Sequence, residues 1–104
     1  MLVITYFELN PEKDPSEILD AFQKIQDAGI GDMMEKWEEK GWYITPDYWG
    51  VFIVDTDTVE DVLRNSNAWR LALPGIFKKV KTCMAAEVEQ YAPILLKLVR
   101  KLKK

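Results

Sequence analysis

The first apolar segment of the chain, Leu2 to Leu9, alternates so that both faces of the predicted strand are apolar. One face carries Leu2, Ile4 and Tyr6, and the other carries Val3, Thr5, Phe7 and Leu9. A strand of this kind needs cover on both of its sides. The sequence therefore begins with a strand that we expect to be buried on both faces.

Two segments with helical character follow this strand. Asp14-Pro15 precedes apolar residues at helical spacing and predicts a helix that Asp14 caps and Gly29 ends. Asp32 to Glu35 repeats the capping pattern and predicts a short helix, which turns Met34 and Trp37 inward and ends at Gly41. A long irregular entry into the next strand is the alternative for this second segment.

The most aromatic part of the chain reads as a β-hairpin. Trp42 to Thr45 is the first predicted strand, Pro46-Asp47 starts the turn, and Gly50 to Asp55 is the returning strand. The returning strand is again apolar on both faces, because Val51 and Ile53 alternate with Phe52 and Val54.

The second half of the chain contains a helix, a strand and a helix. Asp57-Thr58-Val59-Glu60 is a capping box that opens a helix, Asn65 to Asn67 loosens it, and a helical turn around Trp69 follows. After Pro74-Gly75, residues 76–85 alternate as a half-exposed or edge strand does. Residues 88–102 form an amphipathic helix, which either kinks at Pro93 or restarts there.

The predicted order of elements indicates an α+β protein with a ferredoxin-like sheet. Two stretches, "FELNPEKDPSEIL" and "FIVDTDTVEDVL", each run from a strand through an acidic cap into a helix, as two copies of one β-α-β unit do. We expect a four-stranded antiparallel sheet with helices on one face over residues 1–86. Residues 87–104 are expected to form a basic amphipathic helix packed on the domain or on a partner.

The two-sided strands leave one sheet face without a cover in this layout. Each large side chain on that face is worth about 1.5 to 3 kcal/mol when buried, and an exposed apolar sheet promotes aggregation. The covers considered are a second copy, a ligand or nucleic-acid strand, and the terminal helix. We expect a second copy, which closes the two sheets into a homodimeric eight-stranded α/β barrel.

Composition narrows the possible chemistry. The chain has no histidine and a single cysteine, Cys83, which excludes Ser/His and Cys/His nucleophile pairs, an intrachain disulfide and the usual zinc sites. Cys83 is expected to be buried and inert. No metal and no other cofactor is expected.

The charge and hydropathy of the chain argue against nucleic-acid and membrane partners. The last eight residues carry +5, so the net charge of −3 leaves −8 on the rest of the chain. An acidic body argues against a nucleic-acid surface. No apolar run reaches the roughly 18 residues of a membrane span, and no signal peptide is recognisable, so a cytoplasmic protein without a membrane or nucleic-acid partner is expected.

The segments "KGWYITPDYWGVFIVDTDTVEDVL" and "NAWRLALPGIFKKVK" carry a family resemblance. Over residues 1–86 the chain resembles the dimeric α/β-barrel superfamily, which includes antibiotic-biosynthesis monooxygenases and stress-responsive barrel proteins. It is most similar to a branch of small stand-alone proteins of unknown function. The matching features are Val3 to Phe7, Gly41 to Tyr43, Gly50 to Asp55, Val59 to Leu63, and Ala68-Trp69.

Three functions are considered as hypotheses. The first is a protein of unknown function that binds a small apolar or aromatic molecule or has a structural role. The second is a cofactor-independent monooxygenase or isomerase acting on a small aromatic compound, although no pattern places residues on catalytic positions. The third is an assembly protein whose C-terminal helix recruits a partner. The residues considered for ligand binding are Tyr43, Trp42, Asn67, Trp69, Arg70 and Phe52.

Simpler interpretations compete with each candidate. Aromatic residues near a hairpin more often pack in a core or a dimer interface than line a pocket. The carboxylates from Asp55 to Asp61 have the spacing of a helix start, which favours capping over a metal site. The segment "WGVFIVDTDTVEDV" also resembles RNA-recognition domains, but Trp49 occupies the position of their basic residue, so RNA binding is not expected.

Overall fold

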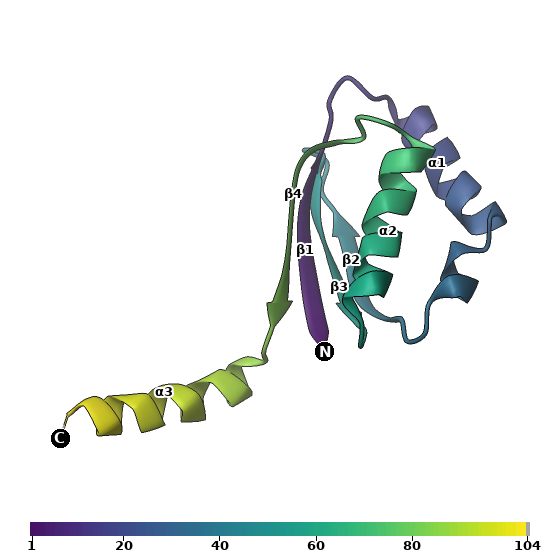
Figure 1. Cartoon of the computed structure of the whole chain (residues 1–104). Helices are drawn as coiled ribbons and strands as arrows, with labels where there is room; N and C mark the ends of the chain where they lie inside the picture. The colour runs from purple at the N-terminus through teal and green to yellow at the C-terminus, as the bar shows by residue number, and fades with distance from the viewer. Residues whose placement is uncertain (104) are drawn as a thin grey trace.

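The computed structural model describes residues 1–103 (Figure 1). Its elements in chain order are β1 (Leu2–Leu9), α1 (Pro15–Asp27), the 3₁₀ turn η1 (Ile30–Met33), β2 (Glu38–Ile44), β3 (Trp49–Asp55), α2 (Val59–Ala72), β4 (Phe77–Ala85) and α3 (Val88–Leu102). No helix within residues 1–103 has the length and apolar character needed to cross a membrane.

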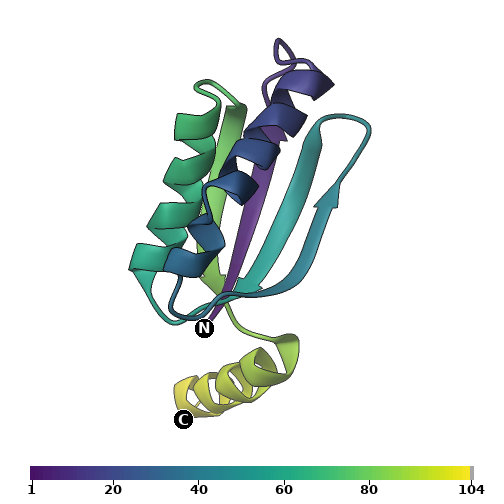
Figure 2. The ribbon, with the colours of Figure 1, turned by 90° about the vertical axis from the view of Figure 1, so that its right-hand side faces the viewer.

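The four strands form one antiparallel sheet in the order β2-β3-β1-β4. Helices α1 and α2 lie together on one face of this sheet, as Figure 2 shows from their side. The predicted α+β, ferredoxin-like fold is therefore confirmed. Asp14 caps α1 as expected, because its Oδ1 accepts hydrogen bonds from the amides of Ser16 (2.9 Å) and Glu17 (3.0 Å).

The core lies between the sheet and the two helices. Alternation along β1 and β3 directs one set of side chains toward the helices, and the pairing of Thr5 with Phe52 keeps the two strands in register. The buried apolar cluster consists of Val3, Phe7, Leu9, Phe52, Val54 and Ile76. The strand faces predicted from alternation thus match the structure.

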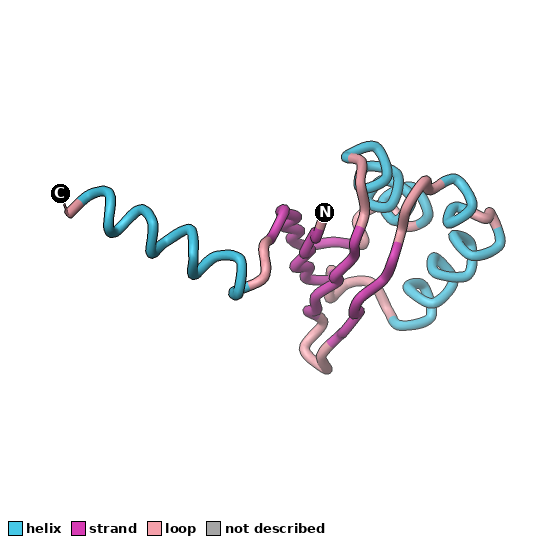
Figure 3. The backbone as a smooth tube through the Cα atoms, turned by 90° about the horizontal axis from the view of Figure 1, so that it is seen from below, coloured by secondary structure: helices cyan, strands magenta, loops and turns pink. Residues whose placement is uncertain are grey.

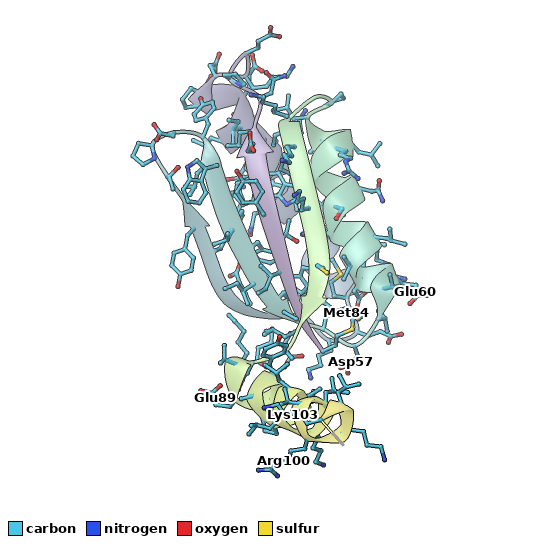
Figure 4. All side chains as sticks on the ribbon, turned by 90° about the vertical axis from the view of Figure 1, so that its left-hand side faces the viewer. Asp57, Glu60, Met84, Glu89, Arg100 and Lys103 are labelled. Atoms are coloured by element: carbon cyan, nitrogen blue, oxygen red, sulfur yellow. The ribbon has the colours of Figure 1, made fainter. Side chains whose placement is uncertain are left out.

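The opposite face of the sheet, here called the open face, is covered by no helix (Figure 4). Strands β1 and β3 pair there through Ile4 with Ile53 and Tyr6 with Val51. Tyr43 and Trp49, from the β2–β3 hairpin, add aromatic surface that is 62% and 41% exposed. Each side chain on this face is half-buried or exposed, and none is fully buried.

The segment between Asp32 and Gly41 differs from its predicted helix. Only Ile30–Met33 form a 3₁₀ turn, Met34 is already extended, and β2 begins at Glu38. A contact distant in sequence explains the difference, because the amide of Glu35 donates a hydrogen bond of 3.0 Å to Oδ2 of Asp61 in α2. The alternative, an irregular entry into the strand, describes this segment.

The interruption expected in α2 does not occur, and of the two alternatives for α3 the restart at Pro93 is wrong. Helix α2 runs unbroken from Val59 to Ala72, and within it the Asn67 side chain donates a hydrogen bond to the carbonyl of Leu63 (2.9 Å). Helix α3 starts at Val88 and continues through Pro93, so no new helix begins at that proline.

Helix α3 and the end of β4 are more exposed than the sequence suggested. Cys83, expected to be buried, is exposed, because it pairs with Ile4 on the open face. Figure 3, seen from below, shows α3 extending away from the sheet on the side opposite to α1 and α2. The helix thus does not pack against its own sheet.

Candidate functional site

A cleft of about 690 Å³ opens between α1, α2 and the sheet. Its floor is the helix-facing side of β1, β2 and β3, and its walls come from the inward faces of the two helices and from the turn η1. Its aromatic lining consists of Phe7, Phe22, Trp37, Trp42, Tyr48, Phe52, Trp69 and Phe77. Aliphatic lining comes mainly from Ile18, Leu19, Ile25, Ile30, Met34 and Ile44.

The rings around Trp42 form the centre of this lining. The Trp42 ring centroid lies 5.8 Å from that of Trp69 and 5.7 Å from that of Phe52, both in edge-to-face geometry, and 5.6 Å from that of Phe22. Aromatic pairs in this arrangement contribute about 0.5–1.5 kcal/mol beyond the area they bury. The rings therefore support one another and hold a rigid apolar wall.

Strand register and helix periodicity place these rings on one wall. Trp42 is the direct cross-strand partner of Phe52, so both side chains point toward the helices. Phe22 in α1 and Trp69 in α2 meet above them. Trp42 remains 43% exposed, because the two helices leave the β2 edge of the sheet uncovered. The cleft opens at that edge.

Few polar groups reach the cleft. Apart from the Tyr48 hydroxyl and the tryptophan N–H groups, the polar residues in its lining are Thr5, Gln26, Glu39 and Asn65. The Thr5 hydroxyl lies 3.0 Å from that of Thr82. Glu39 is the one charged residue in the lining of this cleft, and within residues 1–103 it forms no ion pair. The arrangement suits an apolar or aromatic molecule with a small number of polar contacts.

The structure separates the six residues predicted to bind a ligand into two groups. Trp42, Phe52 and Trp69 line the cleft together. Tyr43 pairs with Val51 on the open face, and Asn67 and Arg70 are exposed side chains outside the cleft lining.

Sequence reasoning missed the contribution of Phe22 to the cleft, whereas Trp37 and Asn65, which also line it, were candidates from the sequence. The helical spacing of Ile18, Phe22 and Ile25 predicted an apolar stripe on α1, but not that a space remains beneath it. Asn65 takes the place expected for Asn67. Two residues correspond to about 200° around a helix, so only one of these asparagines can face the sheet.

The carboxylates near the start of α2 form ion pairs and a cap. Oδ1 of Asp55 accepts a hydrogen bond from the N-terminal ammonium (2.9 Å), which lowers the pKa of Asp55, and Lys36 lies 3.5 Å away. The hydroxyl of Thr58, and not Asp57, caps the helix by accepting from the amide of Asp61 (3.2 Å). Within residues 1–103 no three metal-ligating side chains gather in one place.

Asp61 is fully buried and ties the chain before β2 to α2. Burial by itself raises the pKa of its carboxyl, but hydrogen bonds from the Glu35 amide, the Arg64 guanidinium and the Lys36 amide outweigh it, and the net pKa is lowered. The Asp61 carboxylate thus ties Glu35 and Lys36, in the segment between η1 and β2, to α2, directly before Trp37 in the cleft lining.

Comparison with known proteins finds likeness among solved structures. No family model matches the chain, and no curated protein matches it. Two crystal structures of protein Atu4242 from Agrobacterium tumefaciens resemble it. The first shares 16% sequence identity with this chain at a TM-score of 0.47, and the matched region covers 83% of this chain and 92% of that protein. The other, described as a NIPSNAP-family protein with unknown function, has 14% identity and a TM-score of 0.47 and covers 81% and 84%.

Proposed function

We propose that this protein is a homodimeric member of the dimeric α/β-barrel superfamily that binds a small apolar or aromatic molecule in the cleft beneath α1. The observation that carries the proposal is the cleft, whose volume of about 690 Å³ is lined mainly by aromatic and aliphatic side chains. Binding pockets for small molecules commonly have about 300–1,000 Å³ and a few polar groups that orient the ligand.

The ring cluster supports binding of a flat molecule. The Trp42 and Trp69 planes meet at 75°, so between them they offer both a face and an edge to a ligand entering past β2. Glu39 and Asn65 are placed to make polar contacts with it. The expected ligand is therefore an aromatic compound with a hydrogen-bond donor.

The open face supports the dimer. Its apolar and aromatic side chains come from β1, β2 and β3, and the exposed residues Lys79 and Lys81 of β4 border it. Contiguous apolar surface of this kind marks an interaction site, and charged edges disfavour pairing with the wrong strand. Two copies that meet through this face bury it and leave each cleft on the outside of the barrel, where a ligand can enter.

Native mass spectrometry of freshly purified protein tests the ligand and the dimer together. We expect a dimer that carries a retained small molecule, or that binds the apolar fluorophore N-phenyl-1-naphthylamine with one site per chain. Trp69→Leu removes one ring of the wall and is expected to abolish binding. Arg70→Gln is the matched control, because Arg70 is the next residue along α2 and its side chain lies outside the cleft lining. Equal binding by the wild type and Trp69→Leu contradicts the proposed site.

A further inference from the structure

Helix α3 is strongly amphipathic, and within residues 1–103 no other element of the chain covers its apolar side. Its apolar stripe consists of Val88, Tyr91, Leu95, Leu98, Val99 and Leu102. These side chains are exposed, Leu98 by 53% and Leu102 by 82%. An isolated helix of this length is only marginally stable in water, and most helices in proteins depend on packing of their apolar face. The stripe therefore needs a cover.

The direction of α3 indicates where that cover lies. Only Ala86 and Glu87 separate β4 from α3. Figures 1 and 3 show the helix leaving the sheet on the side of the open face, away from α1 and α2, and in Figure 4 it projects forward beneath the sheet. Any molecule that packs on the open face consequently meets α3 at the end of the strands.

The length of α3 matches a second copy at that position. Its 15 residues span about 22 Å at a rise of about 1.5 Å per residue. Two sheets packed face to face lie about 10 Å apart. A helix that starts at the edge of one sheet and runs toward the other thus reaches past the strands of the second copy.

Charge also favours a second copy over an anionic surface. Lys97, Arg100 and Lys101 lie opposite the apolar stripe, and the last eight residues carry +5 while the rest of the chain carries −8. The helix is attracted by the acidic body of another copy. That same body is repelled by an anionic membrane, which weakens a membrane as the alternative cover.

We infer that α3 is an exchanged arm, which packs its apolar stripe across the strand ends of the second copy in the dimer. The inference rests on the proposed dimer. It assigns to α3 the role of a clamp, in which each chain holds its partner through Leu95 and Leu98. In this arrangement the dimer is stabilised at the ends of the strands as well as through the two open faces.

Sedimentation equilibrium of full-length variants tests the clamp. Leu95→Gln/Leu98→Gln places two polar groups in the stripe and is expected to raise the dimer dissociation constant at least about a hundredfold. Lys97→Gln, on the opposite side of the helix, is the control and is expected to change it by less than about threefold. In hydrogen exchange, amides 88–102 of the wild type should be protected in the dimer and lose protection when dilution separates the copies.

The outcomes distinguish this inference from the proposed function. A wild type that is monomeric at every concentration contradicts both. A dimeric wild type whose dissociation constant is unchanged in Leu95→Gln/Leu98→Gln overturns the clamp and leaves the dimer through the open face intact. Unprotected amides 88–102 in the dimer, or protection gained only on adding phosphatidylserine vesicles, also overturn it.

Discussion

Gly50→Ala is expected to be the most damaging conservative substitution in the sheet. A Cβ at this position would lie 2.0 Å from the carbonyl oxygen of Tyr43 and 2.6 Å from Cζ of Phe7. Cβ contacts below 3.0 Å are essentially never seen, so β2 and β3 would have to separate by about 1 Å at their pairing of Ile44 with Gly50. Overpacking costs about 1–3 kcal/mol, and the backbone contact puts this case at about 3 kcal/mol.

Urea unfolding, followed by circular dichroism and tryptophan fluorescence at one fixed protein concentration, measures this loss. About 3 kcal/mol corresponds to a fall in melting temperature of roughly 12–24 °C for a domain of this size. Gly31→Ala is the matched control, because its Cβ would meet no atom within 4 Å. Gly31→Ala is expected to raise the free energy of unfolding by about 0.4–1 kcal/mol, because alanine lowers the conformational entropy of the unfolded chain. Equal stability of Gly50→Ala and Gly31→Ala refutes the proposed close approach of β2 to β3.

Three further substitutions test other parts of the structure. The pKa of Asp61 is lowered in the folded state, so its ionised carboxylate contributes to the free energy of unfolding. This contribution is complete above the unfolded pKa of about 3.9 and is lost as the pH falls through the folded pKa. Asp61→Asn should therefore make the free energy of unfolding fall less steeply at acid pH. Tyr48→Phe removes the hydrogen bond of 3.1 Å from the Tyr48 hydroxyl to a loop carbonyl and should cost about 1 kcal/mol in urea unfolding. The edge-to-face pair of Trp42 and Trp69 should give an exciton-coupled tryptophan signal in the far-ultraviolet circular dichroism spectrum. Trp69→Phe should remove this signal. The control Trp49→Phe, on the open face, should leave it in place.

Alternation and capping were sufficient to predict most of the fold. The period-two pattern of β1 and β3 assigned each side chain to its observed face, and Asp14 with Pro15 located the start of α1. These signals are local, because a strand face and a helix cap are determined by residues within a few positions. The sequence also indicated correctly that the helices cover only one side of the sheet.

The errors arose where a distant contact decides the local structure. The capping pattern at Asp32 predicts a helix, but the hydrogen bond from the Glu35 amide to Asp61, 26 residues away, holds that segment extended. The choice between Trp42 and Tyr43 for the cleft depends on which sheet face the helices cover. Sequence reasoning named both residues, and only the assembled fold separates them.

The thiol of Cys83 provides the most direct measurement of whether a second copy covers the open face. This side chain is exposed on that face in the single chain, where it pairs with Ile4, and it is the only cysteine in the sequence. We expect the native protein to react slowly with a disulfide reagent such as Ellman's reagent, and to react faster as dilution separates the copies. A thiol that reacts in concentrated native protein as fast as in denatured protein would contradict a dimer through this face.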